Sequence, residues 1–341
     1  MTRPNSAHYI LVVFIALGIA VLALSFGTSR LSMMQIWASL TQIQQGAQSN
    51  ADIIIQQIRL PRILLGFTVG ALLGLAGSSI QGLFRNPLAE PGLLGVSTGA
   101  TLSAMAVLIL FPGVFALTYE WLGGFTLPVF AFVGAALSTF VVLAIQGTQS
   151  ASTTTMILAG VAVNIVAGAG ISLCAYLATD EQLRTLTFWG LGSLGSANWT
   201  KATIAVMGLL VCWPLLWRCY RPLNALLLGE SEARHLGFNV RRLKILVILL
   251  VALAVGTAVA FCGIIGFVGL VIPHIVRMIF GPDHRHVIPL STLLGGILLV
   301  LSDLFARVVI APAEIPVGVV TAAIGGPFFI FLLVRNRRVL L

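Results

Sequence analysis

The chain has 341 residues, of which 58% are hydrophobic and only 9% are charged, and its mean hydropathy is +1.05. A soluble domain carries roughly 25% charged residues, so this composition excludes a soluble globular protein. The net charge of +9 could suggest nucleic-acid binding. Cytoplasmic loops of membrane proteins collect Lys and Arg, however, so we expect the charge to reflect membrane orientation and expect no nucleic-acid partner.

Long continuous apolar runs predict an all-α, polytopic transmembrane bundle. A spanning helix needs about 20 mostly apolar residues, whereas a membrane barrel would show short alternating strands. About ten helices fit, at residues 8–28, 58–83, 91–111, 125–146, 154–177, 200–217, 243–262, 265–280, 286–309 and 315–334. The chain has no linker or low-complexity tract, so residues 1–341 are expected to form a single transmembrane domain.

The even number of predicted spans places both termini on the same side of the membrane. With the N-terminus in the cytoplasm, thirteen of the 19 Lys and Arg residues lie on the inner side. The bias of cations towards the cytoplasm therefore predicts that both termini are cytoplasmic. The first apolar run, residues 9–27, is long for a signal peptide, and we interpret it as an uncleaved first helix.

Small residues recur every four positions along the second span, at Gly66, Gly70, Gly74, Ser78 and Gly82. This spacing predicts a smooth helix face that another backbone can approach closely. The fifth span repeats the pattern at Gly160, Asn164, Gly168 and Ser172. An asparagine in mid-bilayer needs a partner or water, so lining of a transport pathway and helix packing both stay open for this face.

Two segments resemble each other weakly. RILLGFTVGALLGLAG (62–77) and KILVILLVALAVGTAVA (244–260) each start a span with a cation followed by Ile-Leu. Five spans separate them, so two repeats would have opposite orientations, as in many transporters. Two unrelated apolar helices would give the same pattern.

Polar and stiff residues interrupt the apolar pattern at RNPLAEPGLLGVSTGA (85–100). Pro87 disfavours helical angles at Asn86. Pro91 suits the first turn of a new helix, with Glu90 near its positive end. The stretch therefore predicts a tight turn on the inner face, followed by a helix rich in Gly, Ser and Thr.

This stretch resembles the signature of permeases that import iron chelates, haem and vitamin B12, the FecCD family of ABC permeases. Five further segments are similar to that family, in its order and at its spacings: IRLPRILLGFTVGALLGLAG (58–77), MILAGVAVN (156–164), LLLGESEARHLGF (226–238), GIIGFVGLVIPHIVRMIFGPDHR (263–285) and PAEIPVGVVTAAIGGPFFI (312–330). The resemblance implies ten spans per subunit in the bacterial inner membrane. It also implies a second permease copy, which we expect to form a homodimer, together with two cytoplasmic ABC ATPase subunits and a periplasmic substrate-binding protein.

The longest polar inner segment, residues 222–244, carries the start and stop signals of two short helices. Asn224 can cap a first helix that ends near Gly229. Glu230 and Glu232 suit the positive end of a second helix, and Gly237 can end that helix. The resemblance implies that this is the coupling segment, seated in a groove of the ATPase, and a solvated loop that holds the orientation is the alternative. The candidate coupling residues are Gly229, Glu230, Glu232, Ala233 and Gly237.

Three arginines on the outer side run against the charge bias of the topology. Arg59 and Arg62 open the second span, and Arg307 lies near the outer end of the ninth. The resemblance implies that arginines at these positions meet glutamates of the binding protein. The alternative is local pairing, because Asp303 and Arg307 stand four residues apart on one helix face.

The inner end of the fifth span carries three hydroxyl residues. Ser152, Thr153 and Thr154 match the inner constriction of the family, so the resemblance implies that they belong to the gate; a helix cap is the alternative. We expect the pathway to continue along Gly160, Asn164 and Gly168 of the same helix.

The sequence lacks the phosphate-loop motif that P-loop enzymes use to hydrolyse ATP. Its only lysines are Lys201 and Lys244, and neither follows a glycine, so a GxxxxGK[ST] phosphate loop is absent. We therefore expect a non-catalytic subunit that binds no cofactor itself, with ATP and magnesium held by the partner ATPase. The four cysteines lie in apolar stretches without CxxC spacing, so no metal site is expected.

The expected cargo is a bulky chelate. All five histidines map to the inner side and the predicted mid-membrane regions lack acidic residues, which argues against an ion-coupled carrier acting alone. The outer segment 178–199 resembles haem permeases, and its Phe188–Trp189 pair suggests a short lid helix or an interfacial anchor. We therefore rank haem first, a ferric siderophore second and cobalamin third.

Overall fold

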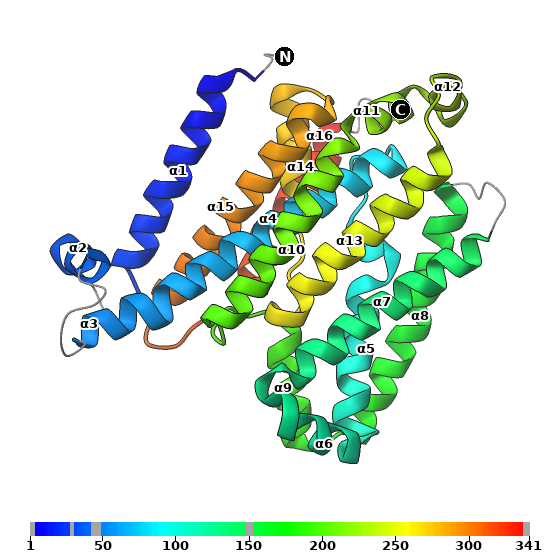
Figure 1. The fold of residues 1–341 in the computed structure, drawn as a ribbon. Coiled ribbons are helices and arrows are strands. Elements are labelled where there is room, and N and C mark those ends of the chain that lie inside the picture. Colours follow the sequence, from blue (N-terminus) through cyan, green and yellow to red (C-terminus); the bar gives the residue numbers. More distant parts are fainter. Residues whose placement is uncertain (1–3, 28–30, 42–48, 148–152, 337–341) are drawn as a thin grey trace.

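The computed structural model describes residues 4–27, 31–41, 49–147 and 153–336, and within these ranges the regular secondary structure is entirely helical. The helices form an elongated bundle (Figure 1). They are α1 (Ser6–Ser25), α2 (Met33–Thr41), α3 (Asn50–Ile53), η1 (Ile54–Arg59), α4 (Leu60–Phe84), η2 (Pro91–Leu94), α5 (Val96–Ile109), α6 (Pro112–Leu122), η3 (Gly123–Phe125), α7 (Thr126–Gln146), α8 (Thr153–Leu177), α9 (Asp180–Gly190), α10 (Trp199–Arg218), α11 (Tyr220–Leu228), α12 (Glu230–His235), α13 (Val240–Cys262), α14 (Val268–Phe280), α15 (His284–Val308) and α16 (Val317–Asn336).

All ten predicted spans correspond to helices. Among the described residues, seven helical stretches are long and apolar enough to cross a membrane, beginning with Ser6–Ser25 and ending with His284–Val308. Three shorter apolar helices, Val96–Ile109, Val268–Phe280 and Val317–Phe331, occupy the remaining predicted spans. The chain is therefore a multi-pass membrane protein.

The centre of the bundle is the pair α4 and α15, which pack against each other along their length. A Cβ added to Gly74 would overlap the carbonyl oxygen of Ser291, and one added to Gly70 would overlap that of Gly295. Only glycine, whose side chain is a single hydrogen atom, lets the backbones of α4 and α15 come this close. The close approach increases the van der Waals contact between the two helices. The small-residue face of the second span is therefore a packing surface.

The segment between α4 and α5 turns at the surface as expected, with residues 85–88 exposed, and then enters the bundle from Ala89 onwards. Pro91 lies beside Gly269, which in turn packs against Gly77, two turns before the end of α4. The backbone N–H of Phe267 donates to Glu90 Oε1 at 3.3 Å. The third predicted span is consequently shorter than expected, because its first residues form η2 and a bend rather than α-helix.

The short helices α5 and α14 occupy corresponding places after α4 and α13. Each follows an interruption of the helix, at residues 85–95 and 263–267. This correspondence agrees with an inverted repeat of the second and seventh spans, which stays a prediction.

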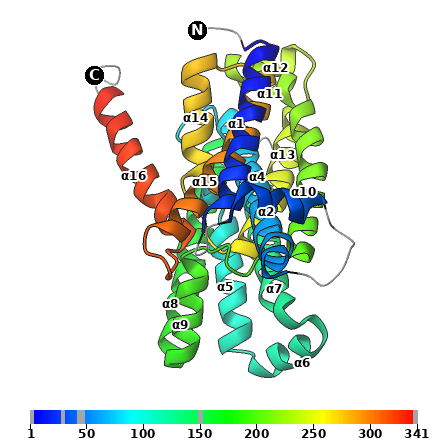
Figure 2. The ribbon, with the colours of Figure 1, turned by 90° about the vertical axis from the view of Figure 1, so that its left-hand side faces the viewer.

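The two ends of the bundle differ. The start of α1 and the end of α16 lie at the end that carries α11 and α12, as the even number of spans requires (Figure 1). Helices α2, α3, α6 and α9 lie towards the opposite end. We call these the coupling end and the distal end. Helix α16 stands away from the body on one side of the molecule (Figure 2).

Candidate functional site

The predicted coupling segment forms two short helices, α11 and α12, joined by a single glycine. Gly229 has φ +133° and Gly237 has φ +86°, backbone angles that favour glycine, and the two residues flank α12. Glu230 and Glu232 lie in its first turn, where carboxylates suit the helix dipole. Ala233 is fully buried and gives α12 a face that packs closely. The expected helices and their glycine stops are present.

Asn224 does not cap the first of these helices, as the sequence had suggested. Helix α11 already begins at Tyr220, so Asn224 lies inside it. Its side chain instead donates to Asp283 Oδ1 at 2.6 Å and accepts the backbone N–H of His284 at 2.9 Å. Asn224 thereby fastens α11 to the start of α15, which local sequence could not reveal.

Glu230 fastens the second helix to two other elements. Its Oε1 accepts hydrogen bonds from Lys244 Nζ of α13 at 2.7 Å and from Thr153 Oγ1 of α8 at 3.2 Å. The Lys244 side chain is only 4% exposed, against 22% for Glu230. The coupling segment is therefore held to the first residue of α8.

The protonation state of Glu230 follows from these contacts. Burial alone would raise the pKa of its carboxyl, but the hydrogen bond and charge of Lys244, with help from Thr153, outweigh it and hold the pKa below its usual range. Glu230 is thus an anion at neutral pH, and its bond to Lys244 is a charge-assisted one.

The three distal-end arginines converge on one buried cluster. Arg62 is 8% exposed, and its Nη2 lies 2.8 Å from Asp303 Oδ1 and 2.8 Å from Glu314 Oε2. Arg307 Nε lies 3.1 Å from Asp303 Oδ2. Arg59 donates to the carbonyl oxygen of Leu24. The local pair that the four-residue spacing suggested is present, but the contacts of Arg62 join helices that are far apart in the chain.

Glu314 is the accessible member of this cluster, and its part in the cluster was not predicted from the sequence. Its side chain is 35% exposed, whereas those of Arg62 and Asp303 are below a tenth. No local pattern marks it, because it lies in the loop between α15 and α16. A carboxylate approaching Arg62 from outside would meet Glu314 first.

The fifth-span residues divide between packing and open space. A Cβ on Gly160 would overlap the carbonyl oxygen of Leu93, and Asn164 bonds the Thr98 hydroxyl and, at 3.1 Å, the carbonyl of Gly92. These two therefore hold α8 against η2 and α5. Gly168 has nothing within 4 Å of an added Cβ, so it faces open space and is available to line a pathway.

The hydroxyl residues at the start of α8 are only partly described. Ser152 lies outside the described residues. Thr153 bonds Glu230, and Thr154 is exposed beside it. Thr153 thus links the expected gate to the expected coupling segment.

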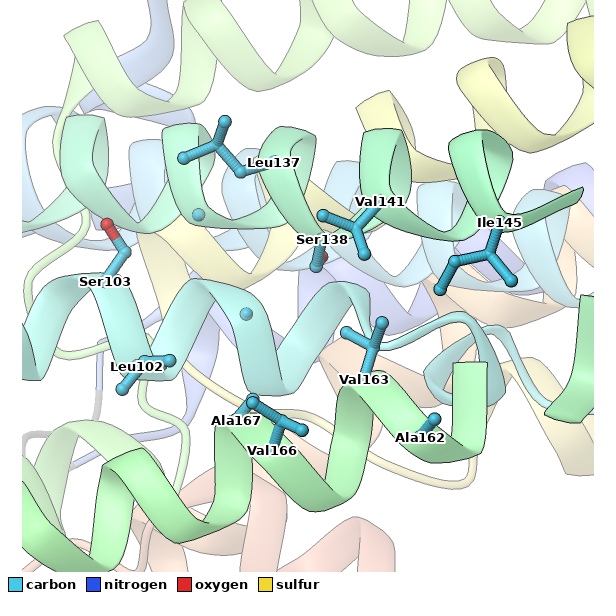
Figure 3. Close-up of a pocket in the computed structure, with 12 residues that line it drawn as sticks. Leu102, Ser103, Leu137, Ser138, Val141, Ile145, Ala162, Val163, Val166 and Ala167 are labelled. Carbon is cyan, nitrogen blue, oxygen red and sulfur yellow. The ribbon is translucent and has the colours of Figure 1, made fainter. Parts of the chain in front are cut away.

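A groove of about 400 Å³ lies over α5, between α7 and α8. Figure 3 shows Val163 and Val166 of α8 facing Val141 and Ile145 of α7 across α5. Ser138 lines it too, but its hydroxyl donates to its own helix at Ala135. Apolar side chains dominate the lining, so this groove suits lipid tails or an apolar partner helix better than a charged cargo.

A metal site is not visible in the part of the chain that the structure describes. No group of three or more His, Cys, Asp or Glu side chains lies close enough there to hold an ion. The four cysteines are buried and unpaired.

Known proteins resemble this chain over nearly its whole length. The sequence pattern of the FecCD transport family matches residues 12–335. The hemin transport system permease protein HmuU of Yersinia pestis is 39% identical over 331 residues, which cover 96% of this chain and 94% of that protein. The vitamin B12 import system permease protein BtuC of Salmonella typhi is also 39% identical, over 319 residues, 90% of this chain and 94% of that protein.

A solved structure has the same architecture. It is a metal-chelate type ABC transporter in an inward-facing conformation, with a TM-score of 0.83 and 30% sequence identity. The match covers 97% of this chain and 100% of that one.

Proposed function

This chain belongs to the FecCD transport family, and we propose that it is the permease subunit of an ABC importer that moves haem across the bacterial inner membrane. In this role it is a non-catalytic conduit, and a separate ATPase subunit binds and hydrolyses ATP with magnesium. Both termini would lie in the cytoplasm, at the coupling end. The relatives include a hemin permease and a vitamin B12 permease.

The observation that carries this proposal is the attachment of α11 and α12. Each helix of this pair has one polar anchor, Asn224 to the start of α15 and Glu230 to α13 and α8. Such a double attachment makes the pair a rigid projection, which can transmit a push from a partner into the bundle. Two cytoplasmic ATPase subunits, one for each permease copy, are the proposed partners.

A second copy of the chain is the proposed partner within the membrane. Helices α8 and α16 expose large apolar side chains, among them Ile165, Tyr176 and Phe331. Both helices lie on the same side of the molecule in Figure 2. A dimer across this side would place Gly168 and the start of α8 near a shared pathway.

The distal cluster is the proposed contact for a periplasmic binding protein. Arg59, Arg62 and Arg307 would receive its carboxylates, as the family resemblance implies. Glu314 already provides Arg62 with a carboxylate, so a partner glutamate would take its place. Reversing Arg59 and Arg62 to Glu should weaken capture of the binding protein, with a dependence on salt.

Haem is the first choice of cargo, followed by a ferric siderophore and cobalamin. The hemin permease matches 331 residues and the vitamin B12 permease 319, at equal identity. The stretch 178–199 contains helix α9, whose partly exposed aromatic pair, Phe188 and Trp189, lies at the distal end where cargo would be received.

The test is transport by the full complex in proteoliposomes. The chain is reconstituted with its proposed ATPase and binding-protein partners, and the binding protein is loaded with hemin, a ferric siderophore or cobalamin. Hemin should give the largest stimulation of ATP turnover and should accumulate inside. Stimulation by another chelate alone would overturn the choice of cargo. Uphill uptake by the chain alone, driven by a voltage or pH difference, would overturn the importer assignment.

A further inference from the structure

A two-part groove runs between α1 and α15 on the flank of the bundle. The first part, of about 480 Å³, lies at the coupling end, and its lining includes Tyr9, Trp217 and Arg285. The second part, of about 430 Å³, is lined by apolar side chains of α1, α4 and α15, such as Leu17. Leu293 lines both parts, so they adjoin. The groove therefore has a polar end and an apolar continuation.

A cation at the polar end lacks a counter-ion. Arg285 is exposed, and within the described parts of the chain its guanidinium makes no hydrogen bond or ion pair. The carboxylate next to it, Asp283, is already engaged by Asn224 and by the backbone N–H of Arg285. Arg285 is thus free to meet an anion from outside.

His286 adds a second polar group to this end. Its Nδ1 lies 2.8 Å from the hydroxyl of Tyr9, a contact that fixes the ring and links α1 to α15. Among the described residues Nε2 has no hydrogen-bond partner. The imidazole can therefore donate from Nε2 when Tyr9 donates to Nδ1.

Stacked aromatic rings mark this end as the level of the membrane surface. The rings of Trp213 and Trp217 lie 5.8 Å apart at an interplanar angle of 2°, and Tyr220 follows at 5.8 Å from Trp217. Trp and Tyr gather where acyl chains meet headgroups. Arg221 lies over the Tyr220 ring at 5.7 Å and adds another cation at this level.

We propose that this groove binds one anionic phospholipid, with its phosphate at Arg285 and His286 and an acyl chain along the apolar part past Leu293. Basic pockets between transmembrane helices on the cytoplasmic side are known to bind anionic headgroups. A free phosphate would leave the apolar part unfilled, whereas a phospholipid matches both halves. The site lies on α1, α4, α10 and α15 and is independent of which cargo the chain carries.

The site can be tested by native mass spectrometry of the purified full-length chain. The probes are phosphatidylglycerol and phosphatidylcholine with identical acyl chains. Arg285→Gln should lower the affinity for phosphatidylglycerol about fivefold, the usual effect of one cation at the surface. The control Arg184→Gln removes an exposed cation from α9, at the distal end, and should leave this affinity unchanged.

The apolar half has its own matched pair of variants on α1. Ala20→Trp places an indole in the groove and should abolish retention of phosphatidylglycerol. Ile15→Trp adds the same side chain at an exposed position that lines neither part, and should retain the lipid. Elution of every variant as a single symmetrical peak in size-exclusion chromatography shows that it is folded.

Three results would overturn the proposal. The first is equal phosphatidylglycerol affinity in the wild-type chain and Arg285→Gln. The second is competition by deacylated glycerophosphoglycerol as strong as that of the intact lipid, which would make the site one for a free anion. The third is a disulfide between two copies carrying Ala20→Cys, which would show that a second chain covers the groove.

Discussion

The bond between Glu230 and Lys244 offers a measurable perturbation of the coupling segment. Glu230→Gln preserves the size of the side chain but removes the charge that Lys244 Nζ meets at 2.7 Å. A hydrogen bond to a charged group contributes about 1.5–3 kcal/mol. The Glu230 side chain is 22% exposed, so solvent screens part of this, and we take about 1.5 kcal/mol. Local opening of α12 should then become roughly tenfold more frequent.

Hydrogen exchange followed by mass spectrometry measures this opening directly. Peptides spanning α12 should exchange roughly tenfold faster in Glu230→Gln than in the wild-type chain. Glu232→Gln is the matched control, because Glu232 is exposed on the same helix and none of its described contacts is a hydrogen bond or an ion pair. Equal exchange in the two variants would refute the claim that Glu230 fastens α12 to the bundle.

The same contact predicts what happens to transport. Because Glu230 joins the coupling segment to Thr153, Glu230→Lys should leave the protein inserted in the membrane while the cargo moved per ATP hydrolysed falls. The ratio is measured in the reconstituted complex. Transport at the wild-type ratio would show that this contact is not used in coupling.

Three further predictions concern the distal cluster, the glycines of α8 and the pKa of Glu230. Asp303→Asn should lower the free energy of unfolding by about 3–5 kcal/mol, because it removes the carboxylate shared by two buried arginines. Glu314→Gln, at a 35% exposed position, should lower the free energy of unfolding far less. Thermal unfolding in detergent compares the two variants, and equal losses of stability would contradict this ranking. Gly160→Ala should lower the yield of folded protein because its Cβ meets the Leu93 carbonyl, whereas Gly168→Ala should be neutral or slightly stabilising. If both variants behave alike, the packing role of Gly160 is wrong. The pKa of Glu230 is held below its ordinary value. The bond between Glu230 and Lys244 should therefore stabilise α12 fully at every pH above the ordinary pKa of a glutamate, and this stabilisation should be lost as the pH falls through the lowered pKa. Exchange of α12, corrected for intrinsic rates, should therefore be flat between pH 8 and pH 6; a rise within that range would refute the assignment.

The sequence by itself determined the class of protein and the course of the chain. Runs of about 20 apolar residues can only be satisfied as helices in a bilayer, because every backbone polar group must be paired within the segment. The glycines at 229 and 237 ended short helices as expected, since their backbone angles suit no other residue well. Apolar runs and helix-ending glycines act on their own stretch of chain, so they determine local structure whatever the tertiary packing is.

Only the tertiary structure decided which partners the polar residues have. Arg62 bonds Asp303 across 241 positions of sequence, and Thr153 bonds Glu230 across 77. Asn224 was predicted to cap a helix and instead joins two helices. In a low-dielectric bundle each polar group must find a partner, but periodicity and capping rules reach only a few residues along the chain. The choice among distant partners is made by how the helices pack.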